Sequence, residues 1–439
     1  MQFIQQELDW LSELITLRLK SYFQHQDSDI FTVAPPDAGK EDSPYAQFIV
    51  SHGLTFEDRV ALAMAFAAYL KPELLDCFCI KNSDTGLRFA EFGCVERTGG
   101  RILSPTLETI LFILSAGDID KRLKLASYFI TNDLFISHCF VKDSAIKDTE
   151  DFSSWILRPS EELLDQIILN KPFRPHFSED FPASLIKTER SWEDLILEDE
   201  TMKQVQEILL WTKYGETVRQ DWGLQNKIKP GFKAIFCGPP GSGKTFTATL
   251  LGKATGLDVY RIDLSMLVSK YIGETEKNLS KVFRLAEGKN WILFFDEADA
   301  LFGKRTGVKD SHDKYANQET AYLLQRIEDY PGLIILSTNL KSNIDDAFSR
   351  RFQSIIRFKM PSETERLRLW QSSFSEKSKM DSDVSLEEIA ADYEISGGSI
   401  INVVQYCSVL SYSRGENIIR KEDILEGIRR EFLKDGKIT

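Results

Sequence analysis

Hydrophobic positions in the second half of this 439-residue chain recur as short apolar runs separated by helical patterns. The runs read AIFCG, DVYRIDL, WILFFDE, LIILSTN and SIIRF. Short apolar strands that alternate with helices predict a mostly parallel sheet covered by helices on both faces. We therefore predict an α/β domain over residues 191–360. Patterns such as TERLRLWQSSF and KEDILEGIRREFL then predict a small helical lid over residues 361–439.

The amino-terminal segment shows helical periodicity. An amphipathic helix is predicted over residues 1–26, because apolar residues recur there near the spacing of one helical face: Ile4, Leu8, Leu11, Ile15 and Leu19. We interpret this face as packing on its own domain rather than on another subunit or a partner.

Residues 44–170 mix helical patterns with strand-like pieces. FEDRVALAMAFAAYL and TLETILFILS have the helical pattern, whereas GGRIL and LFISHCF resemble strands. This mixture predicts a small α+β accessory domain. Three prolines follow it with few periodic apolar positions, which predicts a linker over residues 171–190: Pro172, Pro175 and Pro182.

The composition is that of an ordinary globular protein, with 42% hydrophobic and 28% charged residues. No apolar stretch reaches the roughly 20 residues that a membrane span needs. The first residues, MQFIQQELDW, lack the blocks of a secretory signal. Six irregularly spaced cysteines fit a reduced compartment better than a disulfide framework. We expect a cytoplasmic protein without a membrane span.

Negative charge is concentrated in the first half of the chain. Residues 1–190 hold 19 Lys and Arg against 29 Asp and Glu, which gives −10 of the total net charge of −13. Nucleic-acid affinity rests largely on basic residues that neutralise phosphates. The charge therefore argues against nucleic acid as a partner and favours a protein.

The segment GPPGSGKT has the G-x-x-x-x-G-K-[ST] pattern of a phosphate loop, between the strand AIFC and the helix FTATLLGKA. Its glycines let backbone N–H groups and a helix amino terminus face the phosphates of ATP. Lys244 supplies positive charge to the β and γ phosphates, and the Thr245 hydroxyl can bind Mg²⁺. The predicted nucleotide-binding residues are Gly238, Pro239, Pro240, Gly241, Ser242, Gly243, Lys244, Thr245 and Phe246.

Two carboxylates end the apolar strand in WILFFDEAD. Ligands of open α/β sheets gather at the carboxyl ends of their strands. Asp296 is placed to hold Mg²⁺, and Glu297 is placed to orient and deprotonate the attacking water. The pair alone is a moderate signal, but together with the phosphate loop it predicts ATP hydrolysis.

Further polar residues follow the next strand. Asn339 ends GLIILSTN, where its amide can help to position the water. Arg350 and Arg351 stand in DDAFSRRF, ahead of the last strand. Phosphoryl transfer needs a cation on the γ phosphate in its transition state, which gives these arginines a candidate role.

With these motifs in order, residues 191–439 resemble an AAA+ module of the AAA clade. The resemblance implies a ring, usually a hexamer, in which the double arginine acts on the ATP of the neighbouring subunit. A residue that reaches the ATP of a neighbour in this way is called an arginine finger. Arg350 and Arg351 adjoin without an intervening Pro-Gly, so it stays open which of the two is the principal finger. The small-residue signature of the lid is matched loosely by SGGSI, with Gly397 and Gly398, and no sensor arginine is evident there.

The segment SKYIGETEKNL is similar to the first pore loop of this clade. The resemblance implies that Tyr271 and Ile272, flanked by Lys270 and Gly273, grip a polypeptide in the central channel. The alternative is that Tyr271 packs in the core. Residues 303–319 lie where the second pore loop would be.

A narrower resemblance covers residues 308–353. They are similar to AAA+ ATPases encoded beside bacterial contractile injection systems, which are headless phage tail-like particles. In the accessory region, FAEFG and the Gly-rich turn after it resemble the winged-helix-like domain of some of those proteins.

These features favour a hexameric ATPase that uses Mg²⁺ and ATP to remodel, disassemble or thread a protein. The alternative is a nucleic-acid remodeller or helicase-loader-like ATPase, since AAA+ modules also serve that role. A nucleotide-gated scaffold without turnover is disfavoured because Glu297 is intact.

Overall fold

The computed structural model describes residues 2–25, 29–96, 103–141, 154–178, 181–264, 274–299, 311–339, 350–434 and 436. The chain divides into two compact units, residues 1–174 and 175–439.

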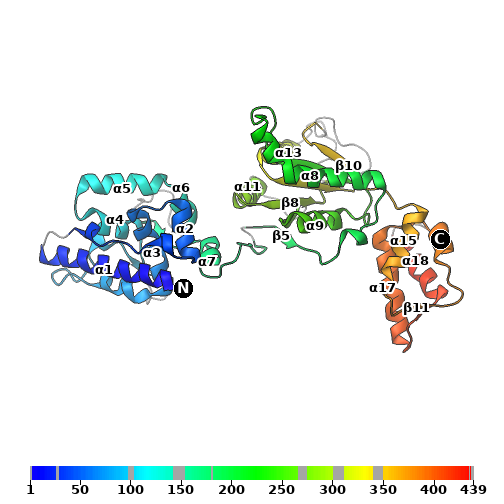
Figure 1. The fold of residues 1–439 in the computed structure, drawn as a ribbon, viewed down its shortest axis with the longest axis horizontal. Helices are drawn as coiled ribbons and strands as arrows, with labels where there is room; N and C mark the ends of the chain where they lie inside the picture. Colours follow the sequence, from blue (N-terminus) through cyan, green and yellow to red (C-terminus); the bar gives the residue numbers. More distant parts are fainter. Residues whose placement is uncertain are drawn as a thin grey trace. The chain divides into compact units, whose positions relative to one another are not determined.

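The first unit is mainly helical (Figure 1). Its described strands are two residues long and form two antiparallel pairs, β1 with β2 and β3 with β4. Its elements are α1 (Gln2–Gln24), α2 (Pro44–His52), α3 (Phe56–Leu70), β1 (Val95–Glu96), β2 (Leu103–Ser104), α4 (Leu107–Ser115), α5 (Ile119–Thr131), α6 (Asp133–His138), β3 (Phe140–Val141), β4 (Ile156–Leu157) and α7 (Glu161–Ile167).

Helix α1 packs into the core of this unit. Its buried apolar side chains join those of α3 and α4 in one cluster, in which Leu8, Leu11 and Ile15 are buried as the periodicity predicts. The buried face is broader than the predicted stripe, because Trp10 and Leu14 are also buried. The helix therefore packs on its own unit, as we interpreted from the sequence.

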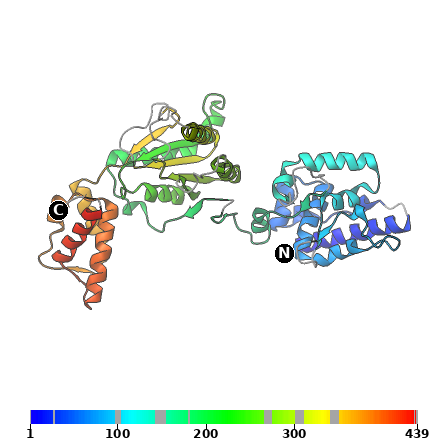
Figure 2. The same ribbon diagram turned by 180° about the vertical axis from the view of Figure 1, so that it is seen from behind.

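The second unit contains the predicted α/β sheet (Figure 2). Its strands lie in the order β10-β6-β9-β8-β7-β5, parallel except for the edge strand β5. The elements are β5 (Ser184–Ile186), α8 (Asp199–Asp221), β6 (Phe232–Cys237), α9 (Lys244–Thr255), β7 (Asp258–Asp263), α11 (Glu274–Ala286), β8 (Trp291–Asp296), α13 (Ser311–Asp329), β9 (Leu333–Thr338) and β10 (Ser354–Arg357).

Both faces of the sheet are covered, because alternate residues of a strand point to opposite faces. Ile292 and Phe294 of β8 lie in one cluster with residues of α8 and α9. Phe295 points to the other face, where it stacks on Phe283 of α11. Strands buried on both faces explain the near-continuous apolar run WILFF.

The predicted linker 171–190 is only partly a linker. Residues 184–186 form β5, which pairs antiparallel with β7. Phe181 is buried against Tyr260 and Trp291 of the sheet. The prolines of this stretch suggested a flexible connection, but residues 184–186 add a strand to one edge of the sheet.

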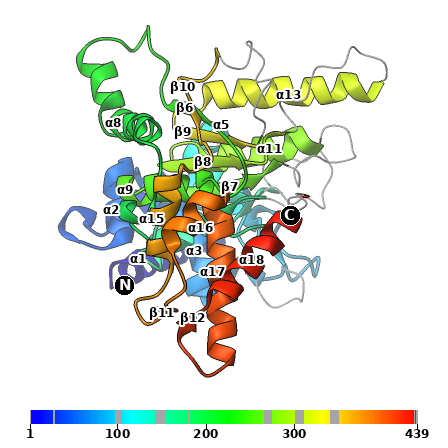
Figure 3. The same cartoon turned by 90° about the vertical axis from the view of Figure 1, so that its right-hand side faces the viewer.

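The helical lid follows β10 and has its own core around the buried Trp370. Its helices lie together with a short parallel strand pair in Figure 3. The lid elements are α15 (Glu363–Ser373), β11 (Lys379–Met380), α16 (Leu386–Asp392), α17 (Gly397–Ser413), β12 (Ile418–Ile419) and α18 (Lys421–Lys434). Among the helices that the structure describes, none has the length and apolar character of a membrane span.

Candidate functional site

The phosphate loop, residues 238–243, connects the end of β6 to the start of α9. Gly238 has φ 157°, and a Cβ there would lie 2.1 Å from the carbonyl oxygen of Phe358, so the loop approaches this segment at a distance that only glycine permits. Helix α9 begins directly at Lys244, and the positive end of a helix favours an anion at this place.

Lys244 is almost fully buried, and three oxygens accept hydrogen bonds from its Nζ. The acceptors are the Gly238 carbonyl at 2.8 Å, the Pro239 carbonyl at 3.0 Å and Asn339 Oδ1 at 3.0 Å. Burial lowers the pKa of the Lys244 ammonium, while the nearby Asp296 carboxylate opposes that shift. The lysine is therefore held at the loop with its donors directed at protein oxygens.

The ends of β8 and β9 lie side by side, because Phe295 of β8 pairs with Leu336 of β9. This register places Asp296 and Asn339 at one edge of the sheet, next to the phosphate loop. The sheet topology thus brings together residues from three separate motifs.

Glu297 is exposed and has φ 51°, in the left-handed region that non-glycine residues seldom adopt. Its N–H donates to Asp296 Oδ1 at 3.1 Å. The next residue, Ala298, donates its N–H to the Ser337 carbonyl at 2.8 Å. Strained backbone of this kind clusters at functional sites, which supports a chemical role for Glu297.

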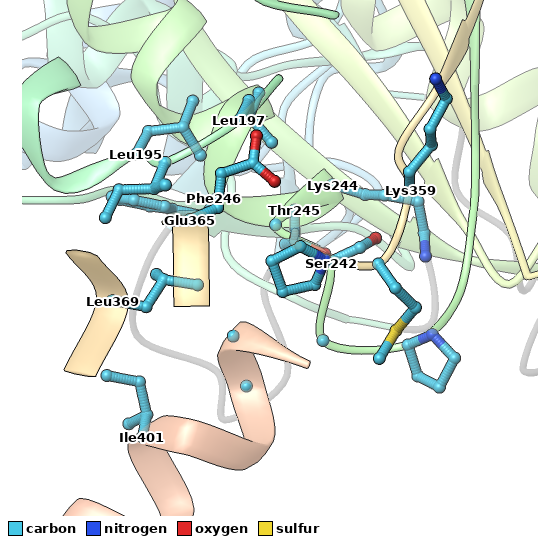
Figure 4. A pocket seen from close by; sticks show the side chains of 18 of the residues that line it. Leu195, Leu197, Ser242, Lys244, Thr245, Phe246, Lys359, Glu365, Leu369 and Ile401 are labelled. Carbon is cyan, nitrogen blue, oxygen red and sulfur yellow. The ribbon is translucent and has the colours of Figure 1, made fainter. Parts of the chain in front are cut away.

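A pocket of about 750 Å³ lies over these residues (Figure 4). Its polar end is lined by the phosphate loop together with Asp296, Glu297 and Asn339. Its volume is in the range of small-molecule sites. The hydroxyl of Ser242 is buried without a hydrogen-bond partner among the described residues. Buried polar atoms are normally satisfied, so this orphaned oxygen fits a polar ligand in the loop.

The apolar end of the pocket comes from segments far apart in the sequence. Figure 4 shows Leu195 and Leu197 on one side and the lid residues Leu369 and Ile401 on another. Sequence reasoning missed all four residues, because isolated leucines and isoleucines carry no motif. An apolar end beside a phosphate-binding end suits a nucleotide, because the two faces of its flat base are apolar.

The lid also contacts the phosphate loop through glycines. Gly398 donates its N–H to the Gly241 carbonyl at 3.0 Å. A Cβ at Gly398 would lie 2.9 Å from Gly241 Cα. The loosely matched SGGSI segment therefore lies against the loop itself, and Gly397 and Gly398 line the pocket.

The double arginine is not brought to the pocket, since neither residue lines it. Arg350 is exposed. Arg351 forms an ion pair with Glu328 of α13, with 2.9 Å between Nε and Oε1. Arg351 is exposed as well, so both side chains lie at the surface of one chain.

The predicted pore residues Lys270, Tyr271, Ile272 and Gly273 lie outside the described residues, as do residues 303–310 of the second pore segment. The rest of that segment, from Ser311, belongs to α13.

Comparison with known families identifies the central part of this unit. Residues 234–360 match the family model described as ATPase family associated with various cellular activities (AAA). This part of the chain is therefore similar to the ATPase domain of the AAA family. The parallel sheet with flanking helices is the fold predicted for this α/β domain.

Several curated proteins that resemble this chain are also ATPases by name or by family. The chain is 34% identical over 211 residues to the proteasome-activating nucleotidase of Aeropyrum pernix, covering 46% of this chain and 51% of that protein. It is 27% identical to the Cell division cycle protein 48 homolog of Archaeoglobus fulgidus, over 85% of this chain and 51% of that protein. It is 30% identical to the 26S proteasome regulatory subunit 6A of Saccharomyces cerevisiae, over 46% of this chain and 49% of that protein. The chain spans about half the length of these relatives.

Proposed function

We propose that this protein is a ring-forming AAA ATPase that hydrolyses Mg·ATP to remodel, disassemble or thread a protein substrate. The observation that supports this most directly is the pocket that joins the phosphate loop, Asp296, Glu297 and Asn339 to an apolar end. Residues from three motifs that are separated in sequence line this one pocket.

The site residues have distinct roles in this proposal. Lys244 exchanges its internal acceptors for the β and γ phosphates of ATP. Thr245 and Asp296 are the residues that would hold Mg²⁺, which neutralises charge on the phosphates. Glu297 accepts a proton from the water that attacks the γ phosphorus. The bond from that phosphorus to the bridging oxygen then breaks, which leaves ADP and phosphate.

The arginines require a second copy of the chain. Neither Arg350 nor Arg351 reaches the pocket of its own subunit, yet the transition state needs an added cation. We infer that they act on the ATP of the next subunit, in a homo-oligomer that is a hexamer by family resemblance. Head-to-tail contacts of this kind form a ring when the rotation between neighbouring subunits closes.

A protein is the substrate that fits the remaining features. The acidic first half of the chain disfavours nucleic acid. One similar protein is named for activating the proteasome. The pore residues inferred from resemblance, Tyr271 and Ile272, would grip an unfolded chain. The link to contractile injection systems rests on the resemblance of residues 308–353.

Substitution of Glu297 by Gln tests the catalytic assignment. The variant should bind Mg·ATP as the wild type does but lose turnover by several orders of magnitude, because the water lacks its base. Glu422→Gln changes an exposed glutamate of the lid in the same way and should keep full turnover. A Glu297→Gln protein that retained more than a tenth of wild-type turnover would assign the base to another residue.

The same variant also tests the substrate class. ATP-loaded Glu297→Gln should retain bound protein that wild type releases, and mass spectrometry would identify it. DNA binding that is tight and weakens steeply with salt would instead favour the nucleic-acid alternative.

A further inference from the structure

Asp299 lies three residues beyond Asp296 and has no role in the chemistry described so far. One of its oxygens, Oδ1, accepts two hydrogen bonds from the end of β9. The donors are the Thr338 hydroxyl and the Asn339 N–H, the latter at 2.9 Å. A carboxylate that accepts two bonds at one place holds that backbone more firmly than a neutral acceptor does.

The position of Asn339 explains why it needs such an anchor. Thr338 is the last residue of β9, and its carbonyl accepts a bond from the Gly238 N–H at 3.1 Å. Beyond it the ladder of the sheet ends, so the N–H of Asn339 has no strand partner among the described residues. Asp299 supplies the acceptor that the sheet does not.

The side chain of Asn339 continues the connection to the phosphate loop. Its Oδ1 accepts the bond from Lys244 Nζ at 3.0 Å. A continuous path therefore runs from Asp299 through Asn339 to Lys244, linking the segment after β8, the end of β9 and the start of α9.

We propose that Asp299 is a positioning residue for Asn339. It fixes the backbone of Asn339 while the side chain exchanges its partner. In the structure the Asn339 amide oxygen binds Lys244, and on ATP binding Lys244 turns to the phosphates. The amide is then released toward the γ phosphate and the attacking water. This inference rests on the proposed ATP hydrolysis.

The test separates positioning from plain structural support. Asp299→Ala should lower kcat by roughly 10²-fold, the scale expected when a catalytic group is misplaced by about 1 Å. Affinity for ADP, which has no γ phosphate, should change less than about twofold. Asp299→Asn retains an oxygen at the same place as a weaker, neutral acceptor, so its kcat should lie between those of wild type and Asp299→Ala.

A double-mutant cycle gives the sharpest outcome. Because Asp299 acts through Asn339, the double variant with Asn339→Ala should have the same kcat as Asn339→Ala alone. Multiplicative losses would show that Asp299 acts independently and would overturn the inference. Equal losses of ADP and ATP affinity, with a lower melting temperature in both Asp299 variants, would assign it a structural role instead.

Two controls keep the result interpretable. If Asp299→Ala does not fold, Thr338→Val removes one of the two bonds to the same carboxylate, and Thr338→Ser, which keeps the hydroxyl, should restore kcat. Turnover by wild type that is absent in Glu297→Gln first establishes the proposed ATP hydrolysis. If wild type hydrolyses ATP and both Asp299→Ala and Thr338→Val keep full kcat, the inference fails while the proposed function stands.

Discussion

At the scale of single residues, the contact between Gly241 and Gly398 sets how closely the lid approaches the phosphate loop. The two backbones meet through one hydrogen bond, without side chains between them. Gly397, the preceding residue, has more room, since a Cβ there would lie 3.5 Å from the nearest atom, the Gly241 carbonyl oxygen. Neighbouring glycines of one helix thus face different constraints.

This difference predicts a loss of ATP affinity for one of two matched substitutions and little change for the other. Gly398→Ala should weaken ATP binding by roughly tenfold or more, since overpacking costs about 1–3 kcal/mol and here pushes the lid from the loop. Gly397→Ala, with ordinary van der Waals contacts, should bind ATP within about twofold of wild type. Calorimetric titration with a non-hydrolysable ATP analogue would measure both. Equal affinities for the two variants would show that the lid does not need this approach.

At the scale of elements, sequence and structure agree best where a motif is tied to strand order. The phosphate loop and the two carboxylates follow buried strands, so their meeting at one edge could be predicted from the parallel sheet. The apolar end of the pocket could not, because Leu195, Leu369 and Ile401 come together only through the packing of the lid. Asp299 was missed because its role depends on a hydrogen bond to a neighbouring strand.

The apolar periodicity of α1 also could not predict the ion pair through which this helix contacts α3. Arg59 of α3 forms an ion pair with Glu7, whose side chain is fully buried. Arg59 also donates to the Pro36 carbonyl at 2.6 Å. The apolar pattern of α1 predicted its buried side but gave no sign of a charge within that side. A partner from another helix makes burial of this glutamate tolerable.

Removing one partner of this pair should destabilise the protein strongly. Glu7→Ala leaves a buried guanidinium unpaired, which costs about 3–5 kcal/mol. Asp9→Ala, on the same helix as Glu7, is the control, because it removes a more exposed ion pair with Lys71 that is worth about 0–1 kcal/mol. Urea unfolding of the full-length chain should show the first variant alone shifting the transition of the amino-terminal unit. Similar shifts for both would mean that water reaches Glu7.

At the scale of the whole molecule, the pocket of one chain is lined by Lys244 but by neither residue of the double arginine. Both arginines are exposed, and Arg351 also forms an ion pair with Glu328 of its own chain. The sequence left open which arginine is the principal finger. Because Arg351 would first have to leave Glu328, we expect Arg350 to be the finger and Arg350→Ala to lose more turnover than Arg351→Ala.

Mixing subunits tests this expectation together with the ring. Arg350→Ala should lower turnover by roughly 10³-fold or more while ATP still binds through Lys244. Lys244→Ala should not bind ATP but keeps its arginines. In a mixture, some interfaces join an intact phosphate loop to an intact Arg350, so activity should reappear although neither parent is active. Wild type that stays monomeric and fully active at every protein concentration would exclude a shared site. If subunits exchange and no activity returns at any ratio, either the arginine acts within its own chain or turnover needs several intact sites at once.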